Sequence, residues 1–228
     1  VIDDDESSRP KEVASFFYKF FSASSSMYFN YGSAIDPFGN LVDENGESIG
    51  PQGRTIDTSK YVLSNGLICE NEQRDNEYTK IMGEKIADRY LRENVALTSH
   101  FIAYCFFEFL KMRYPEYDLF RLIRLSEEDS TIDLNTFSNF CGPMLDKLHE
   151  MYRVGRIQLE PALRSNEFKN ILEAAIRNLG VYHTKRPIKA IQDHSIASED
   201  VKLLYYYRNR MSGYSLFKST MKDAPTER

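Results

Sequence analysis

The amino-acid sequence predicts a mainly α-helical protein, in which a helical carboxyl-terminal domain follows a short α/β segment and a turn-rich insert. Apolar residues recur at helical spacing over most of residues 72–228, whereas turn-forming residues are concentrated in residues 36–53. Hydrophobic residues make up 42% and charged residues 28% of the 228 residues, which suits a folded chain and argues against disorder. We therefore expect three parts, comprising residues 1–35, 36–71 and 72–228.

The amino-terminal parts contain one predicted helix, one predicted strand and a predicted hairpin. Pro10–Ala23 starts with a proline suited to a first helical turn and repeats apolar residues every three or four positions. Met27–Tyr31 reads M-Y-F-N-Y, which is typical of a strand. Asp36–Gly53 is dense in turn signals, and Tyr61–Cys69 predicts a small hairpin around an Asn-Gly turn.

The remainder of the chain is predicted to be helical. Val95–Arg113 is apolar nearly all round, which indicates a buried central helix, whereas its neighbours are amphipathic. Gly180 suits the position after a helix end, and Ser198 suits a helix N-cap. The predicted helices are Glu72–Asn94, Val95–Arg113, Pro115–Leu125, Asp133–Val154, Ser165–Leu179 and Ser198–Ser219.

Charge is distributed unevenly along the chain. The net charge is −5, but residues 185–228 carry nine Lys or Arg and five acidic residues, a net +4, which leaves −9 on residues 1–184. The acidic bulk argues against general nucleic-acid binding. The basic tail suits a phosphate, a nucleotide or an anionic lipid surface.

Other sequence signals bear on compartment and membrane insertion. The three cysteines are far apart and form no C-x-x-C pair, so no disulfide framework or zinc site is predicted and a reducing compartment is favoured. The start, Val1 followed by an acidic run, is unlike a signal peptide and suggests a piece cut from a longer protein. The longest apolar run, Val95–Leu110, is too short and too polar to span a bilayer.

No catalytic or metal motif is found, and no cofactor is predicted. The sequence contains no H-E-x-x-H, G-x-S-x-G, P-loop or G-x-G-x-x-G pattern. The nearest match to a histidine with a carboxylate partner is His194 with Glu199, and a surface histidine in a loop is the simpler interpretation of it.

Five residues are candidates for binding a substrate or a lipid phosphate: His100, Lys185, Arg186, Arg208 and Arg210. His100 lies on the predicted buried helix, so it is either a core histidine bonded to a serine or a carbonyl, or a group facing an adjoining domain. Arg208 and Arg210 do not share a helix face, so one is expected to pair with an acid while the other faces solvent. The alternative for both is contact with phosphate or anionic lipid. Lys185 and Arg186 form either a solvated loop or an anion site.

Several segments, taken in order, cover nearly the whole chain and together resemble one enzyme family. Y-F-N-Y-G-S-A-I-D-P-F-G-N (Tyr28–Asn40) resembles the strand and turn that close the acyltransferase domain of glycerol-3-phosphate acyltransferases, and R-P-K-E (Arg9–Glu12) looks like the element before it. Val42–Asp57 is similar to the turn-rich insert of the bacterial members. The other similar segments are Gln73–Thr79, Asn94–Tyr104, Tyr114–Leu125, Gly180–Thr184 and Lys202–Tyr214.

The resemblance implies an enzyme at the cytoplasmic face of the cell membrane, held there peripherally. Such an enzyme transfers a fatty acyl group from acyl-CoA or acyl carrier protein to glycerol 3-phosphate. In that family a His-x4-Asp pair and the phosphate-binding blocks lie ahead of the strand that Tyr28–Gly32 matches, and none of them is present here. No catalytic residue can therefore be carried onto this chain.

We accordingly expect a helical region that packs on an amino-terminal acyltransferase domain and is inactive alone. Met27–Tyr31 would then be a strand without its sheet, so residues 1–70 should be loosely ordered or prone to aggregate. The last helix, with Lys202, Arg208, Arg210 and Tyr205–Tyr207, is expected to help docking on anionic lipid. Two alternatives remain: a non-catalytic helical module that binds lipid or protein, and a self-sufficient enzyme that uses His100 or His194.

Overall fold

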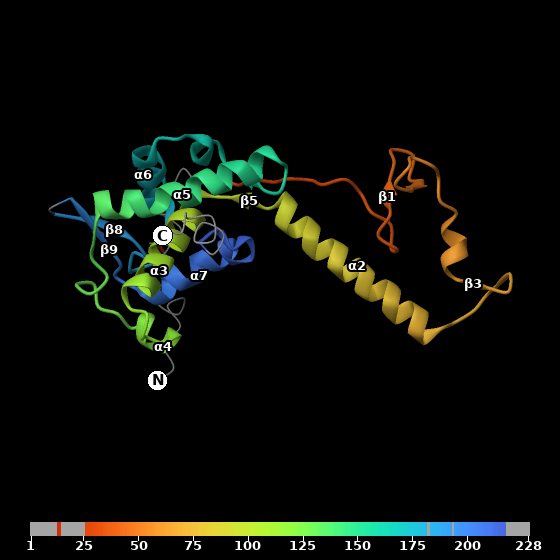
Figure 1. Ribbon diagram of the computed structural model, residues 1–228, viewed down its shortest axis with the longest axis horizontal. Helices are drawn as coiled ribbons and strands as arrows, with labels where there is room; N and C mark the ends of the chain where they lie inside the picture. Colours follow the sequence, from red (N-terminus) through yellow and green to blue (C-terminus); the bar gives the residue numbers. More distant parts are fainter. Residues whose placement is uncertain (1–12, 15–25, 182, 193, 218–228) are drawn as a thin grey trace, which may run out of the picture. The chain divides into compact units, whose positions relative to one another are not determined.

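The computed structural model describes residues 13–14, 26–181, 183–192 and 194–217, and it divides into two compact units at Tyr28/Phe29 and at Asn94/Val95. Helices dominate and are joined by strands of two or three residues, which confirms the mainly α fold class (Figure 1). Helix α2 (Glu72–Glu93) lies in the same unit as residues 29–71, although the sequence assigns it to a helical domain starting at residue 72. The physical reason is that α2 packs on residues 33–61 of this unit, as described below.

The larger unit is built around helix α3 (Thr98–Arg113). Twelve of its sixteen residues are buried, and helices α5, α6 and α7 pack on it, which confirms the predicted buried central helix. The other elements of the unit are β5 (Val95–Ala96), α4 (Leu119–Leu122), β6 (Ile132–Asp133), α5 (Leu134–Arg153), β7 (Gln158–Leu159), η3 (Pro161–Arg164), α6 (Phe168–Asn178), β8 (Lys189–Ile191), β9 (Ser195–Ala197), α7 (Val201–Arg208) and η4 (Asn209–Tyr214).

The start of α3 differs from the prediction by three residues. Val95 and Ala96 pair in parallel with Gln158 and Leu159 and are therefore extended rather than helical. Glu160 is the residue after the paired Leu159, and its buried carboxylate accepts a hydrogen bond from the Thr98 backbone N–H. A carboxylate at this position satisfies a free donor of the first turn and complements the helix dipole, so it fixes the helix start at Thr98.

A small antiparallel sheet and a glycine turn complete the larger unit. β9 lies between β6 and β8, with Ile132 opposite Ile196 and Ala190 also opposite Ile196. Helix α6 ends before Gly180, whose φ is +72° and whose added Cβ would lie 2.3 Å from the Pro187 side chain. The predicted glycine stop is confirmed, since only glycine fits both the left-handed backbone and this close approach.

The last helix is shorter than Ser198–Ser219. It begins at Val201, because the side chain of Asp200, rather than that of Ser198, accepts hydrogen bonds from the Lys202 and Leu203 N–H groups. After Arg208 the backbone tightens into the 3-10 helix η4. The helix predicted over Pro115–Leu125 is likewise reduced to the single turn of α4.

The smaller unit combines two hairpins with one long helix. β1 (Leu41–Val42) pairs with β2 (Ser48–Ile49), β3 (Leu63–Ser64) pairs with β4 (Leu67–Ile68), and the 3-10 helix η2 (Thr58–Tyr61) lies between the hairpins. Asn65 and Gly66 have φ values of +52° and +80°. Positive φ at both turn residues is typical of a type I′ turn, so the predicted Asn-Gly hairpin is confirmed.

Hydrogen bonds and ring stacking hold the smaller unit together. One oxygen of the Asp36 carboxylate accepts the N–H groups of Phe38 (2.9 Å) and Asn40 (2.8 Å), and the other accepts the Ser48 hydroxyl (2.7 Å). The rings of Phe38 and Tyr61 stack at 4.4 Å, and Tyr78 of α2 meets both edge-on. Among the described residues of this unit no apolar side chain is fully buried.

The strand predicted over Met27–Tyr31 is not formed. These residues have no strand pairing with any described part of the chain, and the exposed fractions of Met27, Phe29 and Tyr31 are 80%, 74% and 90%. A strand needs a neighbour for its backbone groups, and sequence composition alone cannot supply one. The helix predicted over Pro10–Ala23 lies outside the described residues, apart from Val13 and Ala14.

Candidate functional site

The polar side chains of α3 line the face that packs on α7 and η4. His100, Tyr104 and Glu108 are four residues apart and therefore lie along one side of the helix. Opposite them are Arg208, the last residue of α7, and Arg210 in η4. Three of the five predicted binding residues are thus brought to one interface within the larger unit.

Arg208 is used inside the protein. Its guanidinium lies 3.8 Å from the Glu108 carboxylate and over the rings of Phe107 (4.9 Å) and Tyr205 (4.7 Å). The Glu108 side chain is 7% exposed, and its carboxylate also forms an ion pair with the Lys111 ammonium group at 3.0 Å. These contacts support the structural interpretation of Arg208, because its side chain is 15% exposed and its charge is paired with the buried Glu108 carboxylate.

His100 is held in its neutral form. Burial and the nearby positive charge of Arg210 lower the pKa of His100 from 6.5 to about 4. The expected serine or carbonyl partner is not found at Nδ1, which is buried and accepts no hydrogen bond from the described residues. A neutral, enclosed imidazole next to a cation lacks the carboxylate that would orient a general base.

Tyr104 fixes the chain that follows η4. Its hydroxyl oxygen accepts a 3.2 Å hydrogen bond from the Phe217 N–H, and burial raises the pKa of Tyr104 to about 12. The polar side of α3 therefore joins three points of the carboxyl-terminal region to the central helix, through His100 near Arg210, Tyr104 at Phe217, and Glu108 at Arg208.

The remaining candidates, Lys185 and Arg186, are exposed in the loop before β8. The Arg186 backbone N–H donates to the Glu199 carboxylate at 2.7 Å, and that carboxylate also pairs with Lys189 at 2.9 Å. Lys189 in turn pairs with Glu127 at 2.9 Å. The backbone hydrogen bond from Arg186 and the Lys189 pair hold the pKa of Glu199 below its ordinary value.

His194 and Glu199 do not form a catalytic pair. His194 is exposed in the turn between β8 and β9 and has a left-handed φ of +56°. Glu199 lies beyond the other end of β9, where it is occupied by Lys189 and Arg186. The simpler interpretation of His194 as a surface histidine in a loop is the one that the structure supports.

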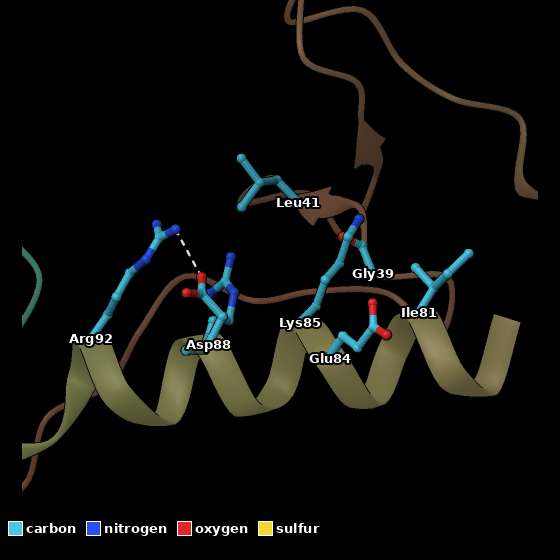
Figure 2. A pocket seen from close by; sticks show the side chains of 8 residues that line it. Gly39, Leu41, Ile81, Glu84, Lys85, Asp88 and Arg92 are labelled. Atoms are coloured by element: carbon cyan, nitrogen blue, oxygen red, sulfur yellow. Dashed lines mark hydrogen bonds and ion pairs between the residues drawn. The ribbon is translucent and has the colours of Figure 1, made fainter. Parts of the chain in front are cut away.

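The smaller unit contains a hollow of about 420 Å³ between α2 and residues 39–41. Figure 2 shows Lys85, Asp88 and Arg92 on α2 beside the segment that carries Leu41. Lys85 donates to the Gly39 carbonyl at 2.7 Å, and Arg92 pairs with Asp88 at 2.8 Å. Arg89 likewise donates to the Ser33 carbonyl. Because these cations bond the backbone of residues 33 and 39 or pair along the helix, we assign the hollow a structural role.

Other site types are not seen in the described part of the chain. It contains no group of three or more His, Cys, Asp or Glu side chains placed to hold a metal ion. Its three cysteines are free, and the buried Cys105 lies with its sulfur 4.0 Å from that of Met144. None of its helices has the length and apolar character needed to cross a bilayer.

Comparison with known proteins leaves the family open: no family model, no curated protein and no solved structure matches this chain.

Sequence reasoning found His100, Arg208 and Arg210 but missed their partners. Glu108 and Tyr104 were visible as polar residues at four-residue spacing on an otherwise apolar helix, which signals a polar seam within a core. Glu160 carried no such signal, because its role depends on the pairing of β5 with β7.

Proposed function

We propose that this chain is the non-catalytic, carboxyl-terminal helical region of an acyltransferase that transfers a fatty acyl group from acyl-CoA or acyl carrier protein to glycerol 3-phosphate. Its direct partner is an amino-terminal acyltransferase domain of the same protein, which binds both substrates. The enzyme acts as a peripheral protein at the cytoplasmic face of the cell membrane and needs no cofactor held by this region.

The state of Met27–Tyr31 carries this proposal. The segment that resembles the closing strand of the acyltransferase domain has strand-like composition, no strand pairing in the described chain, and three alternate side chains that are at least 74% exposed. Exposed apolar side chains on an unpaired segment are costly in water and are favourable when a neighbouring sheet covers them. This is the surface that a strand presents when the rest of its sheet lies elsewhere.

The interface of α3 with α7 gives further support. The resembling segments Asn94–Tyr104 and Lys202–Tyr214 are about a hundred residues apart, yet they pack together, and Arg208 of the second is held by Glu108. A guanidinium enclosed in this way stabilises the domain rather than binding glycerol 3-phosphate. Arg208, one of the residues predicted to contact phosphate, therefore fits a structural region of the enzyme.

The test is acyl transfer by the product of the whole reading frame. We expect that protein to acylate radiolabelled glycerol 3-phosphate with palmitoyl-CoA or palmitoyl carrier protein, and the 228-residue chain to give no turnover. Turnover by the 228-residue chain, or none by the whole product with either donor, would overturn the proposal.

A matched pair of substitutions in the whole protein tests the role of Met27–Tyr31. Phe29 and Leu67 are equally exposed in this chain, at 74% and 73%. We expect Phe29→Asp to lower acyl transfer at least about tenfold, because a charge would be buried in the sheet, and Leu67→Asp to leave it unchanged. Equal effects of the two substitutions would show that the segment is not a strand of the catalytic domain.

A further inference from the structure

The structure gathers exposed positive charge onto one side of the larger unit. Lys202 and Tyr206 are one helical turn apart on the outer face of α7, and Arg210 follows in η4. Val201, Leu204 and Met211 are buried on the opposite face of the same segment. Lys202 and Tyr206 therefore point away from the core that α7 covers, and Arg210, which is exposed, lies in η4 near His100.

The loop before β8 extends this surface. The Arg186 N–H donates to the Glu199 carboxylate and the Glu199 N–H donates to the Arg186 carbonyl. Glu199 lies three residues before Lys202, so the Arg186 loop lies beside the start of α7. The same loop contacts α7 a second time, where the His183 ring meets the edge of Tyr207 at 6.1 Å. We call Lys185, Arg186, Lys202, Tyr206 and Arg210 the basic strip.

The charges of the strip are available to a partner. The side chains of Lys185, Lys202 and Arg210 form no ion pair or hydrogen bond with the described residues, whereas Arg208 is enclosed by Glu108. Two acids adjoin Lys202 in sequence, and both have other partners: Glu199 pairs with Lys189, and Asp200 accepts hydrogen bonds from the first N–H groups of α7. Residues 183–210 carry six Lys or Arg and three acids, a net +3 in a chain of net −5.

Tyr206 gives the strip an amphipathic centre. Its side chain is 69% exposed, next to Lys202 on the same helix face. A tyrosine ring with cations around it is typical of residues that lie at the headgroup level of a membrane. Because residues 1–184 carry a net −9, an anionic surface repels most of the chain and attracts the basic strip, which favours an approach by this side.

We propose that the basic strip docks the protein on an anionic phospholipid bilayer, with Lys185, Arg186, Lys202 and Arg210 contacting lipid phosphates and Tyr206 lying among the headgroups. This inference deepens the proposed function, on which its cellular setting rests. It narrows the residues that the sequence suggested, since Arg208 packs against Glu108, Phe107 and Tyr205 and is excluded, and it joins the loop at 185–186 to the outer face of α7 in one surface.

The test is sedimentation of the 228-residue chain with vesicles, which requires no acyl transfer and can therefore fail or succeed independently of the proposed enzyme. We expect binding to vesicles of phosphatidylcholine mixed with phosphatidylglycerol, no binding to phosphatidylcholine alone, and loss of binding when added salt shortens the Debye length. Each Lys or Arg near an anionic surface raises the constant for binding to the vesicle about fivefold. The double variant Lys202→Glu, Arg210→Glu should therefore bind at least about 25-fold more weakly.

The matched control is the double variant Arg156→Glu, Lys169→Glu, which makes the same charge change at two exposed residues outside the strip. It should bind within about twofold of the parent chain, and an equal loss in both variants would overturn the proposal. If Lys202→Glu, Arg210→Glu does not fold by circular dichroism, Lys185→Glu, Arg186→Glu in the exposed loop replaces it with the same expectation. Retention on immobilised polyglutamate without binding to anionic vesicles would also overturn the proposal and would indicate an acidic protein as partner.

Discussion

The two compact units are each built on a long helix, α3 or α2, but are stabilised by different forces. In the larger unit every turn of α3 up to Leu110 contributes buried side chains, among them Phe101, Phe106 and Phe107. In the smaller unit α2 is longer, at 22 residues, yet none of its residues is buried. Its unit depends instead on the Asp36 hydrogen bonds and the rings of Phe38, Tyr61 and Tyr78.

The difference shows that apolar residues on a helix form a core only where other elements of the chain cover them. In the larger unit helices α5, α6 and α7 cover α3, so we expect this unit to unfold cooperatively. The smaller unit leaves Tyr90 75% exposed, so its stability should be lower and more local. Four predictions test this contrast.

The largest expected effect is loss of core packing in the larger unit. Phe106 is fully buried and its ring lies 5.6 Å from that of Phe137. Phe106→Ala should lower the free energy of unfolding by about 3–5 kcal/mol, because it removes buried apolar surface and leaves a cavity. The matched change in α2, Tyr90→Ala, should cost less than about 0.5 kcal/mol. Urea unfolding followed by circular dichroism measures both, and similar costs would refute the contrast.

The next effect concerns the ion pair between α3 and α7. Glu108→Gln should lower the free energy of unfolding by about 3 kcal/mol, because it leaves Arg208 enclosed without its counter-ion. Adding Arg208→Met should recover part of that loss, since a methionine can fill the space between Phe107 and Tyr205. A double-mutant cycle measures the coupling, and strictly additive costs would show that the pair is not coupled.

The third prediction is a pH dependence confined to the larger unit. The pKa of His100 is about 4 in the folded protein and 6.5 ordinarily, so the unfolded chain binds the extra proton first as the pH falls. The free energy of unfolding should therefore decrease between about pH 6.5 and pH 4, by about 2–3 kcal/mol in total. His100→Gln should flatten this part of the profile, and an unchanged slope in that variant would assign the dependence to other groups.

The smallest effect is local to the smaller unit. Although burial opposes it, hydrogen bonds from Asn40 and Ser48 lower the pKa of Asp36, so its carboxylate is ionised and holds the 36–48 turns. Asp36→Ala should cost this unit about 2 kcal/mol, seen as faster hydrogen exchange at Phe38 and Asn40. Asp43→Ala removes a similar but exposed turn carboxylate and is the control, expected to change exchange only at residues 45–47. Faster exchange throughout the larger unit would contradict the separation of the two units.

Much of the local structure could be predicted from the sequence, whereas the site could be predicted only in part. The ranges of α2 and α5 to within one residue, the Asn-Gly hairpin and the Gly180 stop follow from side-chain periodicity and backbone sterics, which act over a few residues, whereas the helices predicted over Pro115–Leu125 and Ser198–Ser219 are shorter in the structure. The candidate residues His100, Arg208 and Arg210 were also found, but not which of the two arginines faces inward. That choice depends on Glu108, a hundred residues away in sequence.

The sequence by itself determined the mainly helical class, the buried central helix and the basic carboxyl-terminal region, because composition and spacing fix these locally. Only the tertiary structure decided that α2 joins the smaller unit, that Met27–Tyr31 has no strand pairing in the described chain, and that Lys202 and Tyr206 face outward with Arg186 beside the start of α7. Pairing and burial depend on groups distant in the chain, and those groups meet only when the chain folds.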